Sequence, residues 1–377
     1  AATLTRNPDP THSPISNHKH ITLKSVVNHF VENGSTVSLC SLDVSKAFDR
    51  VNHYALFCKL IDRHVPVNMI MILIDWYSKC LGIVNWNGFY SSTFHLLAGV
   101  RQGGCLSPIM FAILMDCVIG AVHESGLGCH IENINFGILM YADDLVLVSA
   151  SIYHLQLMID ICLAQFTELD LAINVKKSVC VRFGKRFQGT CSPITINGKV
   201  VSWSDDVKYL GITFKSGSKL YIDFKQSRTK FFRSFNSIYG KISKANETLI
   251  VSLIKSYCIP SLMFGLEAFD LNISQLRSLD SPLFLAFAKL FKTFDKGTIN
   301  NCMYYLNVLP LSFQYTFRKA NFLSKLKIVE NALLAKLDKK CGRVILDNIY
   351  TDFIVDVRNM CNLRRSIWKK FENLTNV

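Results

Sequence analysis

Apolar positions in the first part of the chain recur at two spacings, which predict short strands alternating with amphipathic helices. Three boundaries are marked by residues that turn or interrupt the chain, at Asn33-Gly34, at Pro66 and at Asn87-Gly88. The predicted elements are a helix over 21–32, a strand over 36–43, helices over 53–64 and 66–81, a strand pair over 82–98, a Gly-rich loop over 99–104 and a helix over 107–125.

The second part of the chain repeats this alternation and then becomes helical. It contains, in order, a hairpin from the apolar runs 136–140 and 145–148, a helix over 152–171, a strand over 179–183, a hairpin over 194–201 and one more strand over 207–214. From residue 218 onward the pattern is mostly helical, with breaks near Pro260, Pro282, Gly297 and Pro310. The order strand, helices, hairpin, helix, strand predicts an α+β fold. We expect a split βαβ, ferredoxin-like antiparallel sheet with helices on one face, followed by a helical unit.

Two adjacent carboxylates stand at the tip of the predicted central hairpin, in Tyr141-Ala142-Asp143-Asp144. A third, Asp43, ends the strand over 36–43. Uncompensated acids at strand ends are costly, so this placement indicates a bound cation. Mg²⁺ takes a few carboxylates together with substrate phosphates, and two such ions can stabilise the attacking and leaving oxygens of a phosphoryl transfer. The three acids therefore predict a nucleotidyl-transfer site.

The net charge of +14 is confined to the second half of the chain. Residues 1–214 contain 16 Lys and Arg against 16 Asp and Glu, whereas residues 215–377 contain 26 against 12. A neutral unit with an acidic site, followed by a basic unit, fits a catalyst with a separate grip for a polyanion. For a charge excess alone, a solvated basic surface on a helical unit is the simpler interpretation.

The thirteen cysteines are scattered singly, and none forms a Cys-x-x-Cys pair. This usage indicates buried, reduced thiols in an intracellular compartment, not a disulfide framework or a zinc knuckle. No apolar run is expected to reach membrane-spanning length, so no membrane partner is expected.

Five short motifs occur in a fixed order along the chain. They are Asp43-Val-Ser-Lys-Ala-Phe-Asp49, Arg101-Gln-Gly-Gly-Cys-Leu-Ser-Pro108, the quartet ending at Asp144, Asn174-Val-Lys-Lys-Ser178 and Tyr209-Leu-Gly211. Together they resemble the palm of reverse transcriptases. The amino-acid sequence around Ser45 to His53 and Gly99 to Gly104 is especially similar to that of non-LTR (LINE-type) retrotransposon polymerases of the Jockey and CR1 kind. The resemblance covers about residues 20–330.

The resemblance implies an RNA-directed DNA polymerase. Such an enzyme transfers a nucleotide from a dNTP to the 3′-hydroxyl of a DNA primer on an RNA template, with two Mg²⁺ ions or with Mn²⁺ in their place. Asp43 and Asp143 would hold both ions, and Asp144 would be a weaker or outer ligand. Lys177 matches the position that protonates the pyrophosphate leaving group. A pair of surface cations, Lys176 and Lys177, is the competing interpretation.

Two further motifs would contact the incoming nucleotide. Phe48 matches an aromatic that packs under the sugar and rejects a 2′-hydroxyl, although a lone Phe in this context would simply be core. Arg101, Gln102 and Gly103 lie in a loop that opens a helix, where glycine allows close backbone approach and the helix start favours anions. Arg101 would reach phosphate or template. Ser107-Pro108 has a structural explanation as a helix cap followed by Pro in the first turn.

The primer and the duplex would be bound by later segments. Tyr209, Leu210 and Gly211 resemble the primer grip, although alone they read as part of a strand. In residues 225–244 the aromatics recur at helical spacing and are expected to face a core. The cations of that helix would face outward and meet backbone phosphate without sequence preference. The residues expected to do so are Lys225, Arg228, Lys230 and Arg233.

The resemblance divides the chain into a leader with a remnant of the fingers (1–35), a palm (36–214), a helical thumb (215–300) and a basic helical C-terminal region (301–377). Only about 40 residues precede Asp43, without a clear equivalent of the basic residues that hold a triphosphate, so an N-terminally truncated copy is expected. Two functions stay open. The retained acids favour an active polymerase, and the missing fingers favour a catalytically dead, nucleic-acid-binding relic. The cysteine usage indicates the nucleus or cytoplasm, and nuclear action is implied by the family alone.

Overall fold

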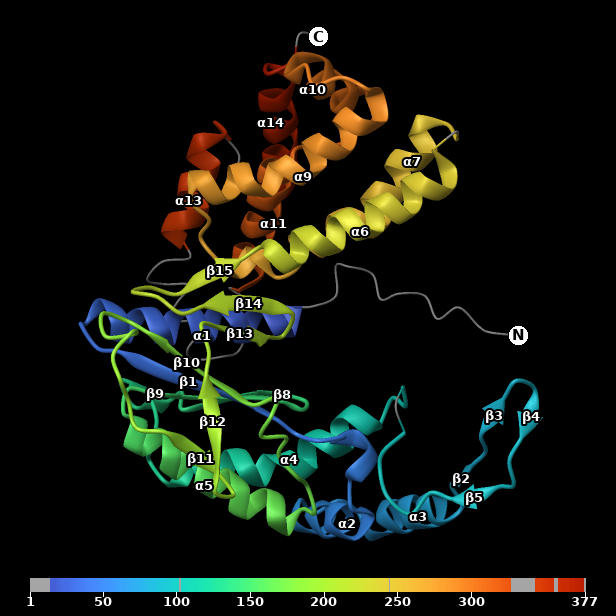
Figure 1. The fold of residues 1–377 in the computed structure, drawn as a ribbon, viewed down its shortest axis with the longest axis vertical. Helices are drawn as coiled ribbons and strands as arrows, with labels where there is room; N and C mark the ends of the chain where they lie inside the picture. Colours follow the sequence, from blue (N-terminus) through green and yellow to red (C-terminus); the bar gives the residue numbers. More distant parts are fainter. Residues whose placement is uncertain (1–13, 102, 244, 327–342, 356–358, 376–377) are drawn as a thin grey trace. The chain divides into compact units, whose positions relative to one another are not determined.

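A computed structural model describes residues 14–101, 103–243, 245–326, 343–355 and 359–375 (Figure 1). The chain divides into two compact units, and each unit is assembled from separate stretches of sequence. Unit 1 takes its residues from Ala1–Ser25, Gly211–Thr213 and Ile222–Val377, and unit 2 from Val26–Leu210 and Phe214–Tyr221. The division falls inside helix α1 (Pro14–Glu32). The predicted boundaries after residues 35, 214 and 300 describe functional parts and stay predictions.

A six-stranded sheet with the order β11-β12-β10-β1-β9-β8 forms the centre of unit 2. Its strands are β1 (Val37–Asp43), β8 (Ile138–Tyr141), β9 (Asp144–Ser149), β10 (Val179–Phe183), β11 (Ile194–Ile196) and β12 (Lys199–Trp203). The four strands β10, β1, β9 and β8 pair antiparallel, and β12 pairs parallel with β10. Helices lie between β1 and β8 along the chain, and one helix connects β9 to β10, which is the connectivity of a ferredoxin-like sheet. The predicted α+β fold class is confirmed.

Helices α4 (Ser107–Glu124) and α5 (Ile152–Glu168) pack together on one face of this sheet (Figure 1). The apolar stripe of α5 is buried, as its periodicity predicts, and it consists of Leu155, Met158, Ile159, Cys162 and Phe166. Strand β9 is apolar from Leu145 to Val148, and all four of these side chains are buried. Because this apolar run is fixed in the core, the acids that precede it are held at one end of the sheet.

Besides α4, several helices and strands of unit 2 lie between β1 and β8 along the chain. They are η1 (Phe48–Arg50), α2 (His53–Asp62), α3 (Val67–Ser78), β2 (Leu81–Gly82), β3 (Asn85–Trp86), β4 (Phe89–Tyr90), β5 (Phe94–His95), β6 (His130–Ile131) and β7 (Ile134–Asn135). Strand β3 pairs with β4, and Asn87 and Gly88 turn between them with positive φ. The predicted turn is confirmed.

A three-stranded sheet follows, formed by β13 (Asp206–Tyr209), β14 (Ile212–Lys215) and β15 (Tyr221–Asp223). The prediction of one strand over 207–214 is wrong, because Leu210 and Gly211 adopt φ of 46° and 85° and turn the chain back. Gly suits such a turn, but Leu rarely adopts positive φ. The apolar character of Leu210 therefore concealed the turn.

Unit 1 is helical after β15. Its elements are α6 (Lys225–Ile242), α7 (Glu247–Leu253), the π-helical turn η2 (Ile254–Cys258), α8 (Ile259–Met263), η3 (Leu266–Ala268), α9 (Ile273–Phe291), α10 (Lys296–Tyr305), α11 (Leu311–Leu326), α13 (Arg343–Asp352) and α14 (Met360–Glu372). The breaks predicted near Pro260, Gly297 and Pro310 coincide with helix starts. The break predicted at Pro282 is wrong, since this residue lies buried inside α9. Burial of the residues around it, including Leu279, Leu283 and Phe287, offsets the cost of about 3 kcal/mol that an interior Pro carries.

An ionic cluster in unit 1 joins α1 to the helices of the second half of the chain. The carboxylate of Asp270 accepts hydrogen bonds from Lys24 and from Lys319, whose Nζ lies 2.5 Å from Oδ1. Lys319 is 4% exposed, and its ammonium also donates to the carbonyl oxygen of Phe269 at 2.6 Å. Three stretches distant in sequence therefore meet at the carboxylate of Asp270.

Two helical stretches, Ser107–Glu124 and Glu247–Ala268, are long and apolar enough to cross a membrane by length and composition alone. The expectation that no run reaches this length is therefore wrong. In α4, however, Phe111 and Leu114 belong to the core of unit 2. The second stretch is divided among α7, η2, α8 and η3 and buries Ile254 in the core of unit 1. Both stretches pack as core elements of their units.

Candidate active site

Strand register brings the three predicted acids to one end of the sheet. Asp43 is the partner of Asp144 in the pairing of β1 with β9, and Tyr141 is the partner of Asp144 across the β8–β9 hairpin. Asp143 lies in the two-residue turn, beside Ala142, whose φ is 53°. A positive φ at a residue with a Cβ is sparsely populated and tends to occur at functional sites. Asp143 and Asp144 are exposed, and the side chain of Asp43 is 41% exposed.

The electrostatics of this end of the sheet reflect three neighbouring negative charges. The pKa of the Asp144 carboxyl is raised, first by partial burial and then by the charges of Asp143 and Asp43. The ammonium of Lys208, on β13, acts in the opposite direction. Lys208 was not predicted from the sequence, because only the fold shows that β13 brings this side chain near the acids.

The segment Asn174 to Ser178 is fixed against the end of β1 by its backbone. The N–H of Asn174 donates to the carbonyl oxygen of Asp43 at 2.8 Å, and the N–H of Asp43 donates to Oγ of the buried Ser178 at 3.2 Å. This attachment leaves Nζ of Lys177 4.0 Å from Oδ2 of Asp43. Lys177 is 71% exposed, so the ion pair itself contributes little stability. The structure thus brings Lys177 to the acids, as predicted from the motif, while its proton-transfer role stays a prediction.

Phe48 and the Gly-rich loop lie side by side. The N–H groups of Gly99 and Val100 donate to the carbonyl oxygens of Val51 and Phe48, both at 2.8 Å. Gly99 has φ of 92°, and a Cβ there would lie 2.8 Å from the carbonyl oxygen of Asp49. Glycine is therefore required for this close approach. The half-buried ring of Phe48 stacks on Phe111 of α4 with centroids 4.5 Å apart.

The predicted nucleotide loop opens α4 as expected, but its cap differs. Arg101 and Gly103 are exposed, and Gln102 lies outside the described residues. The helix begins after Leu106, which makes no side-chain cap, so the prediction of a Ser107 cap is wrong. Instead, Oγ of the buried Ser107 donates to the carbonyl oxygen of Arg101 at 2.6 Å. This hydroxyl therefore holds the loop and not the helix end.

Tyr209 and Leu210 are both buried, so the predicted primer-grip residues present backbone and not aromatic surface. The pKa of Tyr209 is raised, first by burial and then by the negative charge of Asp144. The two residues are therefore electrostatic neighbours. Gly211 provides the positive φ of the turn, and a Cβ there would meet the ring of Phe264 at 2.9 Å. Contact of these residues with a primer stays a prediction.

The basic helix α6 has the predicted division of its faces. Phe231 and Phe235 are buried, which confirms that the aromatics form core. Lys225, Lys230 and Arg233 are exposed. Arg228 is half-buried, and its Nη1 lies 3.4 Å from Oγ of Ser278 on α9. Lys225 and Arg228 also line a hollow of about 390 Å³.

The carboxylates suit a divalent cation by their chemistry, but in the described residues they are not grouped closely enough to hold one. All three donors are carboxylates, which suit a hard cation, and the pKa of Asp144 is raised first by partial burial and then by repulsion from the other two. Within the described part of the chain, no three His, Cys, Asp or Glu side chains are grouped closely enough to hold a metal ion as they stand. The predicted magnesium site therefore stays a prediction.

Comparison with known proteins gives a family match over more than half of the chain. Residues 2–214 match the model described as reverse transcriptase (RNA-dependent DNA polymerase). The Pol polyprotein of the type-2 retrotransposable element R2DM from Drosophila melanogaster is 28% identical over 203 residues, which are 52% of this chain and 19% of the relative. The RNA-directed DNA polymerase from the mobile element jockey of the same species is 26% identical over 257 residues, which are 64% of this chain and 27% of the relative. The chain thus spans less than a third of either relative.

Among solved structures, telomerase from Candida tropicalis without ligand is similar over 90% of this chain and 57% of its own, with a TM-score of 0.44 and 15% identity.

Proposed function

The chain belongs to the reverse transcriptase family, and from this premise we propose that it transfers nucleotides from dNTPs to the 3′-hydroxyl of a DNA primer on an RNA template. The observation that carries the proposal is the strand register that sets Asp43 opposite Asp144, with Asp143 in the adjoining turn. Partial burial and the neighbouring negative charges of Asp143 and Asp43 raise the pKa of Asp144, and a cation bound at this end of the sheet would offset that repulsion.

Reverse transcriptases generally use divalent metal ions, and in this chain Asp43 and Asp143 would hold them, with Asp144 adding negative charge beside them. When bound, such ions stabilise negative charge on the attacking and leaving oxygens. The protein itself provides rigidity, because Asp43 is fixed through its backbone by Asn174 and Ser178. Precise placement of reacting groups is a large part of catalysis in phosphoryl transfer.

The remaining groups would bind and orient the substrates. Lys177, whose Nζ lies 4.0 Å from Asp43, would deliver a proton to the leaving pyrophosphate. Phe48 would bound the sugar pocket, and Arg101 would contact phosphate or template from the loop that the Ser107 hydroxyl holds. The cations of α6 would meet the backbone phosphates of the duplex.

The first experiment is dNTP incorporation on a poly(rA)/oligo(dT) primer–template with Mg²⁺, comparing the unmodified chain with Asp143→Ala. We expect incorporation to fall at least about 100-fold, since a group acting on the transition state is lost. Folding should be unaffected, because the side chain is exposed in a turn. Asp205→Ala, which removes another exposed acid of unit 2, should retain activity. Weakened duplex binding with an unchanged rate of incorporation per bound complex would contradict the role given to Asp143.

A second candidate function is nucleic-acid binding without polymerisation. It is favoured by the 26 Lys and Arg against 12 Asp and Glu in residues 215–377. Salt-sensitive binding of the same duplex without any incorporation would support this function over the polymerase.

A further inference from the structure

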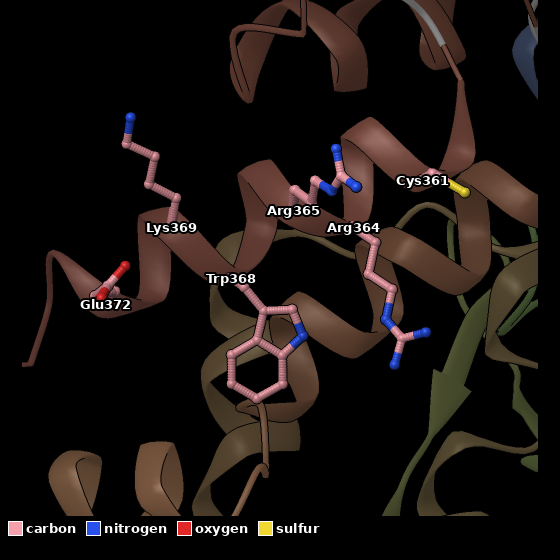
Figure 2. A pocket seen from close by; sticks show the side chains of 6 residues that line it. All are labelled: Cys361, Arg364, Arg365, Trp368, Lys369 and Glu372. Carbon is pink, nitrogen blue, oxygen red and sulfur yellow. The ribbon is translucent and has the colours of Figure 1, made fainter.

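Helix α14 presents a charged stripe that no proposed step of polymerisation uses. Six of its residues, here named the α14 face, line a hollow of about 620 Å³, and they are Cys361, Arg364, Arg365, Trp368, Lys369 and Glu372 (Figure 2). Their separations of three and four positions place them on one side of the helix. In Figure 2, the Trp368 ring and the Arg364 guanidinium project toward the same side of α14.

The opposite side of α14 fixes the helix in the core of unit 1. Leu363, Ile367 and Phe371 are each at most 1% exposed. The side chain of Asn359 accepts the N–H of Asn362 and caps the first turn. A helix anchored in this way holds its outward side chains at fixed spacings, so the α14 face is pre-organised for a ligand.

The charge of the α14 face is strongly positive. Arg364, Arg365 and Lys369 are exposed. Glu372 is the one acid of the helix, and its Oε1 accepts a hydrogen bond of 2.9 Å from the hydroxyl of Tyr304. Lys370 has a different function, because its ammonium lies 4.5 Å from the centre of the Phe353 ring and donates to the carbonyl oxygen of Asp352. The three cations of the α14 face are therefore different residues from Lys370, which contacts the end of α13.

An aromatic ring lies beside Arg364, while the side chains of Arg365 and Lys369 project the other way in Figure 2. Trp368 is half-buried, and its ring meets Tyr304 edge to face, with centroids 6.3 Å apart. The indole therefore packs against Tyr304 while it still lines the hollow. An aromatic platform next to cationic side chains is the combination that binds single-stranded nucleic acid, because each base offers a π-face and each linkage a negative charge.

We propose that the α14 face is a second nucleic-acid site, separate from the polymerase acids, and that it takes single-stranded RNA or DNA. Arg364 and Arg365 contact successive phosphates, since a guanidinium forms paired hydrogen bonds with phosphate oxygens. Trp368 stacks on an unpaired base. A duplex is a poorer ligand, because its bases hide their faces from a half-buried ring. The site does not depend on polymerase activity, so either proposal can fail alone.

Fluorescence anisotropy of labelled oligonucleotides about 12 nucleotides long, matching the span of one such site, tests the proposal on the full chain. Unlabelled primer–template in excess occupies the duplex grip, so the remaining signal reports the second site. We expect Arg364→Ala/Arg365→Ala to weaken binding about tenfold or more, and to reduce the salt slope by roughly 1.4 for two phosphate contacts on a single strand. Parallel titrations with RNA and DNA establish which strand is preferred.

The matched control is Lys185→Ala/Arg186→Ala, which removes two adjacent exposed cations from unit 2 and changes the net charge equally. This control should bind like the unmodified chain. Equal weakening by both double variants would overturn the proposal, because total charge would then explain the binding. Competition by polyglutamate as strong as that by oligonucleotide would also overturn it, by indicating an acidic protein partner. Weaker binding by Trp368→Leu with an unchanged salt slope is expected, because stacking is lost and phosphate contacts remain.

Discussion

Asp144, at the end of the central sheet of unit 2, opposes the stability of the fold above its raised pKa. Asp144 has a raised pKa, so the unfolded chain loses that proton more easily than the folded one. The contribution of this group is therefore most favourable at low pH and declines as pH rises through the raised pKa. A group retained at such a cost is typical of a functional site. Asp43, Asp143 and Asp144 were proposed from the sequence because they stand where apolar strand runs end or turn.

Phe48 permits a test at the scale of one side chain. Its ring stacks on Phe111, so Phe48→Val would remove the bulk beneath the proposed sugar pocket. If the polymerase proposal holds, we expect the ratio of kcat/KM for ribonucleotides over deoxynucleotides to rise about tenfold or more. Single-nucleotide extension with each nucleotide type measures this ratio.

The control for this substitution is Phe57→Val, since Phe57 packs against the same core. It should lose stability without changing the ratio. An unchanged ratio in Phe48→Val, with activity intact, would leave Phe48 as a core residue only.

Other residues of the site could not be identified from sequence, because their function depends on hydrogen-bonding or charged neighbours that only the fold brings close. Ser178 was part of a motif, but its contact with the Asp43 backbone requires the docking of residues 174–178 against β1. Lys208 lies on a strand whose position relative to Asp144 only the fold establishes. Ser107 is a residue type that often caps helices, yet its hydroxyl donates to the carbonyl oxygen of Arg101 instead. Side-chain hydrogen bonds of this kind are set by local geometry.

Among the elements, those with a clear apolar pattern were predicted well. The apolar runs of β1 and β9, and the stripe of α5, determine which faces are buried, and from these the α+β class follows. The hairpin at Leu210 was missed because its first turn residue is apolar and lacks a turn preference. Pro282 was taken as a break because packing that tolerates an interior Pro is a property of the folded core.

The junction between η1 and the Gly-rich loop can be tested at this scale. Gly99→Ala would place a Cβ 2.8 Å from the Asp49 carbonyl oxygen at a φ of 92°. We expect the free energy of unfolding to fall by about 3 kcal/mol, and incorporation to fall with it, because the loop carrying Arg101 separates from Phe48. Urea unfolding measures the first effect.

Gly198→Ala isolates the backbone strain, since Gly198 also has positive φ, of 73°, with no atom within 4 Å of the added Cβ. This variant should lose only about 1–2 kcal/mol. Equal losses in the two variants would show that the close approach at Gly99 contributes nothing.

At the scale of the whole molecule, the two compact units do not coincide with the neutral and basic parts of the sequence. The basic excess lies in residues 215–377, which sequence composition reveals. That unit 1 also includes the first part of α1 is invisible in composition, because it rests on long-range contacts such as that of Lys24 with Asp270. Such long-range pairing is specified by tertiary packing and not by local pattern.

The ionic cluster makes a prediction about pH. Burial alone would raise the pKa of Asp270, but the ammonium groups of Lys319 and Lys24 lower it to about 2. Burial lowers the pKa of Lys319 to about 8, although Asp270 opposes this. Asp270→Asn would leave a buried ammonium without its anion, so we expect a loss of about 3 kcal/mol at pH 7. The loss should shrink above pH 8, where Lys319 is neutral in both folded proteins.

Urea unfolding at about pH 7 and about pH 9.5, on either side of the Lys319 pKa, measures this dependence. Asp75→Asn provides the comparison, because Asp75 pairs with Lys79 on the surface and both side chains are more than half exposed. Its effect should be at most about 1 kcal/mol and independent of pH in this range. A loss in Asp270→Asn that stays constant between the two pH values would contradict the account of Lys319.

The split composition of unit 1 has a consequence for biosynthesis. Lys24 and Asp270 are 246 positions apart, so at about 5–20 residues per second the ribosome adds the partner roughly 12–50 s after the lysine. Unit 2 ends at Tyr221 and can be completed within this interval. The first half of α1, with its apolar Leu23, must wait undocked while its partners are translated. The nascent chain therefore exposes this segment to chaperones and proteases until the residues around Asp270 have emerged.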